Sequence, residues 1–186
     1  AHYRFGKLLL PSLPTHVRQT IQRFRRMYDM GLQGPDFFFY YNPFLKTAVG
    51  DLGKTFHRQS GQVFFTAACA AADSEASLAY LYGLLAHYCL DRTCHKKIRE
   101  ITEDGKIGHI ELETEFDRYL MTLDGIPFPE NFDNSRHMTL TKGECVTVAN
   151  LYPSIKPGDV LQSVQTMAGV TKFLATPKGN RRAWMQ

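Results

Sequence analysis

The 186-residue chain has few cysteines and no long apolar run, and these shortages exclude several protein classes. The cysteines at positions 69, 89, 94 and 145 form no C-x-x-C pair. They predict neither a disulfide framework nor a thiolate zinc site, and we expect reduced thiols that are mostly buried. No apolar run reaches the ~18 residues of a membrane-spanning helix. The net charge of +4 is too small to indicate a specific nucleic-acid partner.

Strand signals are nearly absent, and no repeat or linker divides the chain. We therefore expect a single all-α domain over residues 1–186. No apolar segment of the signal-peptide type is present, which predicts a cytoplasmic protein. The chain begins with Ala1 rather than methionine, however, and a leader can have been removed. Apolar periodicity and capping residues predict helices over residues 16–28, 52–72 with a break at Ser60-Gly61, 76–99, 109–123, 142–151 and 159–175.

The helix expected over residues 76–99 carries the strongest chemical signal. Its segment LLAHYCLDRTCH places His87, Asp91 and His95 four residues apart, so the three project from one face within an arc of roughly 80°. Nearly all residues from Leu78 to Leu90 are apolar, which predicts a helix buried on every side. Two imidazoles and a carboxylate in such a helix must be paired, hydrogen-bonded or bound to metal. The ends of the triplet lie about 12 Å apart, which favours more than one ion, with Asp91 bridging neighbouring ions.

Further nitrogen and oxygen donors lie elsewhere in the chain. His109 and Glu113 are four residues apart on the next predicted helix, a chelating spacing used for zinc. Asp36 follows directly after the Gly34-Pro35 turn and precedes a run of five aromatic residues. Isolated histidines stand at positions 2 and 57. Nitrogen and oxygen ligands without thiolate suit hydrolytic zinc or manganese.

Each of these residues also fits an ordinary role when taken alone. The triplet is compatible with a core helix whose histidines are hydrogen-bonded, Asp36 with a helix N-cap, and Glu113 with a surface of acidic residues. The aromatic run after Asp36 is most simply core, although part of it could line a pocket. We expect His16 to be exposed and His137, in a long loop over residues 124–140, to be structural or superficial.

Taken together, the motifs resemble the bacterial zinc-dependent phospholipase C family. This all-α superfamily also contains single-strand-specific nucleases. The resemblance covers about residues 1–123. It rests on the Gly-Pro-Asp turn ending at Asp36, the isolated His57, the H-x3-D-x3-H segment over residues 87–95 and the H-x3-E segment over residues 109–113. The expected architecture is therefore a helical bundle with a multinuclear metal site between its helices.

The resemblance implies a centre of up to three zinc ions and assigns the ligands as follows. The first ion would take Asp36, His57, His87 and Asp91, the second His95, His109 and Glu113, and the third His2 and Asp91. Asp36 would also orient or deprotonate the attacking water. The secreted enzymes use an N-terminal tryptophan at the third ion, where this sequence has Ala1. The separation of Asp91 and His95 is also shorter than in the secreted toxins, and no additional membrane-binding β domain is present.

The implied activity is metal-dependent hydrolysis of a phosphodiester, either a phospholipid or a related phosphoester. Two alternatives stay open at this point. One is a nuclease or phosphomonoesterase on the same trinuclear zinc scaffold, since the ligands handle the phosphate and not its substituents. The other is a non-catalytic homologue that binds metal or lipid. The sequence does not predict an oligomeric state.

Overall fold

A computed structural model describes residues 1–175, with the exception of the His57 side chain. Residues 176–186, at the end of the predicted domain, lie outside the described part. The described residues contain helices and no strand, which confirms the all-α class. The α-helices are α1 (His2–Leu9), α2 (Thr15–Arg23), α3 (Arg25–Gly31), α4 (Ala48–Arg58), α5 (Gly61–Ala71), α6 (Glu75–Thr102), α7 (His109–Leu123), α8 (Lys142–Ala149) and α9 (Pro157–Leu174). The 3-10 helices are η1 (Leu10–Ser12), η2 (Gly34–Tyr40) and η3 (Pro129–Asn131).

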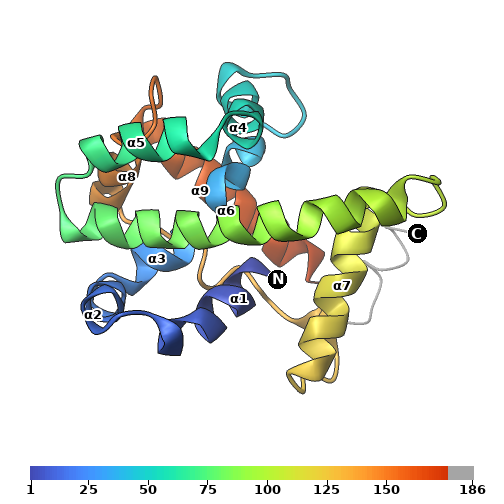
Figure 1. The fold of residues 1–186 in the computed structure, drawn as a ribbon. Coiled ribbons are helices and arrows are strands. Elements are labelled where there is room, and N and C mark those ends of the chain that lie inside the picture. Colours follow the sequence, from blue (N-terminus) through green and yellow to red (C-terminus); the bar gives the residue numbers. More distant parts are fainter. Residues whose placement is uncertain (176–186) are drawn as a thin grey trace.

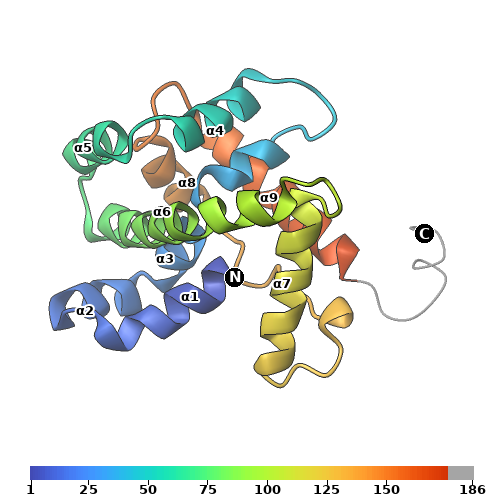
Figure 2. The same cartoon turned by 45° about the vertical axis from the view of Figure 1, so that its right-hand side comes forward.

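Helix α6 is the central element of the bundle. Figure 1 shows it crossing the molecule, with α1, α2 and α3 on one side and α4 and α5 on the other. Helix α7 leaves the C-terminal end of α6 and turns back past the start of α1, an arrangement that is also visible after rotation (Figure 2). A reciprocal capping box begins α6, in which the Ser74 hydroxyl accepts from the Ser77 amide at 3.2 Å.

All the buried residues of α6 lie between Ser77 and His87, and even there one side of the helix is exposed, so the expectation of a helix buried on every side is wrong. Tyr80, Leu84 and His87 are buried, whereas Leu78 is 38% and Leu85 is 45% exposed. Beyond His87 the helix has no fully buried residue, and one face is covered by contacts of Tyr88 with α5, of Asp91 with α1 and of His95 with α7. The candidate ligands project from this covered face.

Two glycines let α3 and α6 approach each other closely. A Cβ atom added at Gly31 would lie 2.2 Å from the carbonyl oxygen of Tyr80. One added at Gly83 would lie 2.2 Å from the carbonyl oxygen of Tyr28. The two backbones are therefore in contact, and any side chain at either position would separate the helices.

The aromatic run after Asp36 forms part of the core, as predicted. Phe37 and Phe38 are fully buried, and both rings pack edge-on against Tyr152. The Tyr152 hydroxyl forms a buried 2.7 Å hydrogen bond with Tyr80 of α6. Tyr152 therefore joins η2 to α6, because it packs against Phe37 and Phe38 of η2 and forms a hydrogen bond with Tyr80 of α6.

Several helix limits follow the sequence signals. The break at Ser60-Gly61 separates α4 from α5, and α7 has the predicted bounds. The Thr141 and Glu144 capping box begins α8. At the start of α4, Thr47 accepts a hydrogen bond from the Gly50 amide at 3.1 Å. Thr47 is therefore the N-cap, and α4 begins at Ala48 rather than at the predicted Leu52.

Other limits differ from the sequence expectation. The helix predicted over residues 16–28 is interrupted at Phe24, whose φ of −117° and ψ of 45° are not helical. Its side chain packs against the main core there, which periodicity alone does not reveal. The segment His2–Leu9, for which the sequence predicts no helix, is helical and carries His2. The thiols are all free, as expected, but Cys145 alone is buried, so their predicted burial is wrong.

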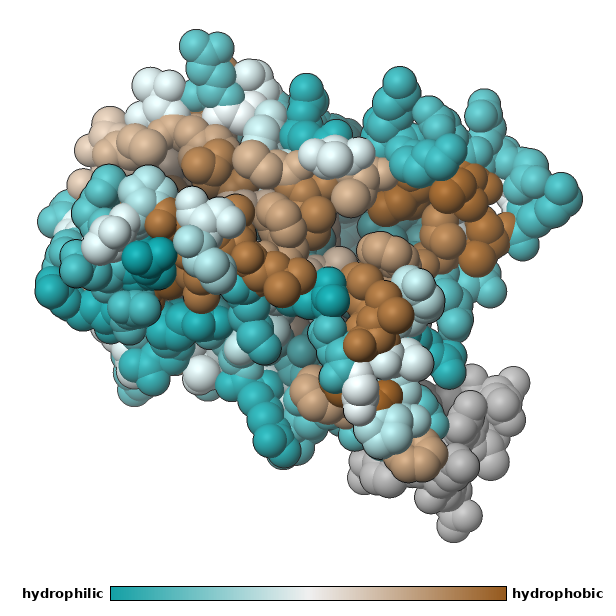
Figure 3. All heavy atoms as spheres, turned by 60° about the horizontal axis from the view of Figure 1, so that its bottom comes forward, coloured by the Kyte–Doolittle hydropathy of each residue, from teal (hydrophilic) through white to brown (hydrophobic). Residues whose placement is uncertain are grey.

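The surface near α7 is partly apolar. This helix has no buried residue, and Phe116 and Leu123 of its apolar stripe are 50% and 59% exposed. Ile101 and Ile110, at the junction of α6 and α7, are also exposed. Figure 3 shows apolar residues gathered in patches on this side of the molecule, separated by hydrophilic ones. No helix of residues 1–175 has the length and hydropathy needed to cross a bilayer.

Candidate metal centre

Helix α1 carries His2 to the candidate centre. It packs against Tyr28 of α3 and against Leu32, the residue that follows α3. A Cβ atom at Gly6 would lie 2.3 Å from the Leu32 side chain, so α1 lies directly against this residue. The buried Tyr28 hydroxyl donates to the Gly6 carbonyl at 2.9 Å. The His2 ring consequently stacks on the ring of His87, with centroids 4.3 Å apart.

Asp91 lies at the centre of the first group of donors. The His2 Nε2 atom donates to its Oδ1 at 2.9 Å, and the His87 Nε2 atom lies 3.2 Å from its Oδ2. The His95 Nε2 atom lies 3.6 Å from Oδ1. Donor atoms of His2, His87 and Asp91 all lie within 4.8 Å of one another.

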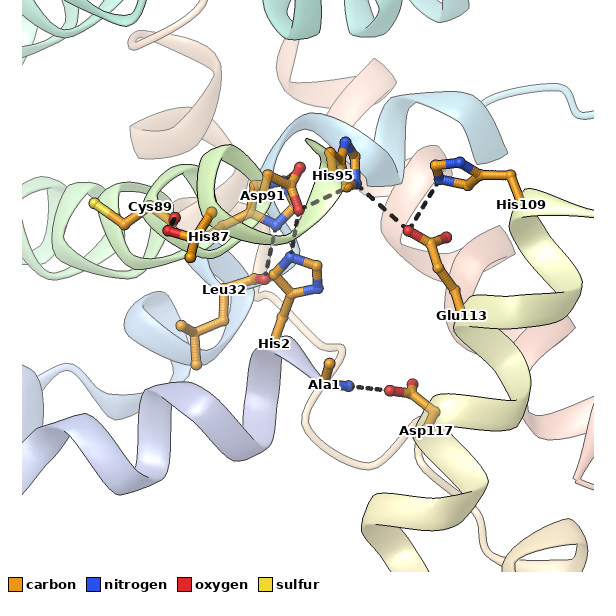
Figure 4. A network of polar contacts seen from close by, with 11 residues as sticks. Ala1, His2, Leu32, His87, Cys89, Asp91, His95, His109, Glu113 and Asp117 are labelled. Carbon is orange, nitrogen blue, oxygen red and sulfur yellow. Dashed lines mark hydrogen bonds and ion pairs between the residues drawn. The ribbon is translucent and has the colours of Figure 1, made fainter. Parts of the chain in front are cut away.

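The second group lies between α6 and α7. The Oε1 atom of Glu113 lies 3.4 Å from His95 Nε2 and 3.1 Å from His109 Nε2. Donor atoms of these three residues also lie within 4.8 Å of one another. Figure 4 shows that His95 links the two groups, since it faces both Asp91 and Glu113.

The orientation of the His87 ring is fixed by a backbone group. Its Nδ1–H donates to the Leu32 carbonyl at 3.2 Å, which turns Nε2 toward Asp91. Burial disfavours a charge on this ring, but the hydrogen bond with Asp91 and the charges of Asp36 and Asp91 outweigh burial and raise the pKa of His87. A histidine that binds a metal through one ring nitrogen usually donates the N–H of the other nitrogen to a carbonyl or carboxylate, and the Leu32 carbonyl is such an acceptor.

The environment of Asp91 keeps its carboxylate ionised. Burial alone would raise its pKa, yet the hydrogen bonds from His2 and His87 and the charges on both rings hold that pKa far below its usual range. A carboxylate that is ionised and largely shielded from water is a strong site for a cation.

The two groups fit zinc by their donor chemistry. They consist of imidazole nitrogens and carboxylate oxygens, with no thiolate. Zinc bonds to such atoms are about 2.0–2.2 Å long, so ligands of one ion lie at most ~4 Å apart. Donors already within 4.8 Å need only small side-chain movements to meet an ion.

The structure places Asp36 beside the first group, in the first turn of η2. Among the described residues it joins neither donor group, but its charge contributes to the raised pKa of His87. The preceding Gly34 has a φ of 59°, and a Cβ there would lie 2.3 Å from the His87 ring. The turn therefore packs against the imidazole. His57 belongs to α4, but its side chain lies outside the described residues.

A cavity of about 410 Å³ opens beside this face of α6. His87, Asp91 and His95 line one part of it. The lining is otherwise largely aromatic, with side chains from α4, α5, α6 and the segment after α8: Phe56, Phe64, Phe65, Tyr88 and Tyr152. Arg92 and Arg99 also line the cavity from α6.

Sequence reasoning did not identify this cavity wall. Phe37 and Phe38 of the aromatic run are core, and the wall instead uses aromatics from other segments. One available signal was the helical position of Tyr88, Arg92 and Arg99, which continue the face of His87 within an arc of roughly 140°. The remaining wall residues come from α4, α5 and the segment after α8 and carry no common spacing.

Two histidines lie outside the centre, as predicted. His16 is exposed on α2. His137 is structural, because its ring stacks on Tyr3 of α1 at 3.9 Å and its Nε2 lies 3.0 Å from the Gln33 side-chain amide. It thereby supports the helix that carries His2.

The chain matches the family model described as Zinc dependent phospholipase C over residues 1–158. It therefore belongs to this family, which agrees with the resemblance of its motifs and supports a metal-dependent, phospholipase C-like role. No curated protein and no solved structure matches the chain.

Proposed function

We propose that the protein is a zinc-dependent phosphodiesterase that cleaves phospholipids in the manner of phospholipase C. The observation that carries this proposal is the shared face of α6, on which His87, Asp91 and His95 meet donors from α1 and α7 beside a cavity with an aromatic wall. The family supports zinc as the cofactor and a phosphoester as the substrate.

The proposed ligands divide the first donor group between two ions, add Asp36 and His57 to it, and keep the second group as it stands. Asp36, His57, His87 and Asp91 would hold one ion, His95, His109 and Glu113 a second, and His2 with Asp91 a third. Zinc bound there supplies an acidified water near neutral pH and positive charge that offsets the charge of the phosphate ester.

The chain's own residues have distinct tasks in this reaction. Asp36 would orient the attacking water and accept its proton, because it is the carboxylate of η2 beside His87. The Leu32 carbonyl keeps the His87 ring in its orientation. The aromatic wall excludes water and holds the apolar part of the substrate. The water oxygen bonds to phosphorus, the bond from phosphorus to the glycerol oxygen breaks, and diacylglycerol leaves with a proton.

Parallel assays of zinc-loaded protein test this function. We expect hydrolysis of a short-chain phospholipid and its loss in His87→Ala and Asp91→Ala, with the exposed His16→Ala variant as the control. Faster cleavage of single-stranded DNA or p-nitrophenyl phosphate would instead indicate a nuclease or phosphomonoesterase. Zinc-loaded protein without activity on any of the three would contradict the enzymatic proposal.

A further inference from the structure

Two arginines share the cavity with the candidate metal ligands. Arg92 and Arg99 both line it from α6, and seven residues of helix separate them by roughly 10 Å along the axis. His95 lies between them on the same face. Helix α6 thus lines the cavity with candidate metal ligands and, interleaved with them along the helix, with two guanidinium groups.

The charge of the cavity is predominantly positive. Asp91 is the one carboxylate among the described lining residues, and it already contacts His2 and His87. Within residues 1–175, neither arginine forms an ion pair with a carboxylate. Both arginines are exposed, so their guanidiniums are available to a ligand, and an anionic group in the cavity would meet two cations.

The lining also disfavours a cationic head group. A quaternary ammonium would need a carboxylate or the open face of an aromatic ring. The described carboxylate is engaged, and the guanidinium carbon of Arg92 lies 6.0 Å from the centre of the Tyr88 ring. The Tyr88 ring therefore already contacts a cation, and the other four aromatic side chains of the wall are those that we assign to the apolar part of the substrate.

We propose that the substrate is a phospholipid whose head group bears its own anionic group, and that Arg92 and Arg99 bind this group while the metal centre holds the scissile phosphate. This inference rests on the proposed function and specifies its substrate class. A phosphate or carboxylate on the head group suits the paired guanidiniums. An oligonucleotide fits less well, because binding a strand requires a cationic track along its backbone and the described lining offers two arginines.

Matched soluble lipids test the proposal without a membrane surface. Dihexanoyl phosphatidylinositol 4-phosphate and dihexanoyl phosphatidylinositol differ by one phosphate, and the corresponding phosphatidylcholine supplies a cationic head group. Zinc-loaded protein should have its highest kcat/KM for the phosphorylated lipid. Arg92→Gln and Arg99→Gln should each lower that value about tenfold, mainly through KM, because one charged hydrogen-bonding partner is lost. The phosphatidylinositol value should change by less than about twofold, since no such partner is lost there.

Lys97→Gln is the matched control. It removes the same charge from an exposed position of α6, but Lys97 does not line the cavity. It should leave all three lipids unaffected. A wild-type preference for phosphatidylcholine, or a phosphorylated-lipid preference that survives both arginine substitutions, would overturn the proposal. An effect of these substitutions on single-stranded oligonucleotide cleavage alone would also overturn it and would favour a nuclease.

A binding measurement separates this inference from the proposed function. Calorimetry with inositol 1,4-bisphosphate and inositol 1-phosphate needs no turnover. Tighter binding of the bisphosphate, lost in the arginine variants but not in Lys97→Gln, supports the head-group site even if no lipid is hydrolysed. Equal affinity for the two compounds contradicts the site even if hydrolysis is observed.

Discussion

The imidazole of His2 donates a 2.9 Å hydrogen bond to Asp91, a residue 89 positions later in the chain. This contact joins the first helix to the central one at the candidate metal centre. It depends on close packing of α1, since Gly6 lies against Leu32 and Tyr28 binds the Gly6 carbonyl. The position of His2 is therefore set by the fold rather than by local sequence.

Replacement of His2 by alanine should weaken zinc binding at the first donor group. Loss of a residue that merely supports a ligand costs about 10–100-fold in affinity, so loss of a direct ligand should cost at least about 100-fold. A competition titration with a zinc-binding dye measures this change. His16→Ala removes an exposed histidine from α2 and should bind zinc as the wild type does. Unchanged affinity in His2→Ala would exclude His2 as a ligand.

Gly34→Ala should destabilise the protein and disturb His87. The residue has a φ of 59°, and its Cβ would lie 2.3 Å from the imidazole. We expect a loss of about 2–4 kcal/mol in the free energy of unfolding, from backbone strain together with the steric clash. Urea denaturation measures it. Gly143→Ala is the control, because no atom lies within 4 Å of its added Cβ. Equal stability of the two variants would show that the turn does not pack on His87.

Gly83→Ala should separate α6 from α3. Its Cβ would lie 2.2 Å from the Tyr28 carbonyl oxygen, and a backbone group cannot move aside as a side chain can. We expect a destabilisation of about 3 kcal/mol or more. Gly169→Ala in α9 has no neighbouring atom within 4 Å and should be neutral or slightly stabilising. Thermal unfolding of both variants compares them, and a Tm for Gly83→Ala equal to that of the wild type would refute the close crossing.

His137 should make stability depend on pH. Burial, with a smaller contribution from the charge of Arg25, lowers the pKa of His137 to about 4 from an ordinary 6.5. The unfolded chain therefore binds a proton in the window between these values, while the folded protein does not. Stability is retained above about pH 6.5 and falls as the pH drops toward 4, by on the order of 2–3 kcal/mol from this group.

Urea denaturation at pH 7 and pH 5 tests this dependence. His137→Gln should lose less stability between the two pH values than the wild type, although it starts from a lower value because the stacking on Tyr3 is gone. The same pH-dependent loss in both proteins would show that His137 is not held neutral in the fold.

The sequence predicted those features that depend on neighbours along the chain. The spacing of His87, Asp91 and His95 placed them on one helix face, and the Thr141 capping box marked the start of α8. His95, His109 and Glu113 were expected to act together, and their donors do meet. These are consequences of helical geometry and of short-range hydrogen bonds.

Features that depend on distant packing were not predictable in the same way. The break at Phe24 and the partial exposure of α6 follow from which elements pack against each segment. Apolar composition predicted that α6 is buried on every side, because composition does not reveal how many neighbours cover a helix. The place of Arg92 and Arg99 in the cavity lining was not predictable for a related reason, because charged residues beside a motif are usually solvated.

The central claim is that these nitrogen and oxygen donors form a zinc centre. Anomalous scattering from crystals of zinc-loaded protein, measured across the zinc absorption edge, tests it most directly. The account predicts zinc peaks between His87 and Asp91 and between His95 and Glu113. A fully ordered site with no anomalous peak at these residues, or zinc bound only elsewhere on the surface, would contradict it.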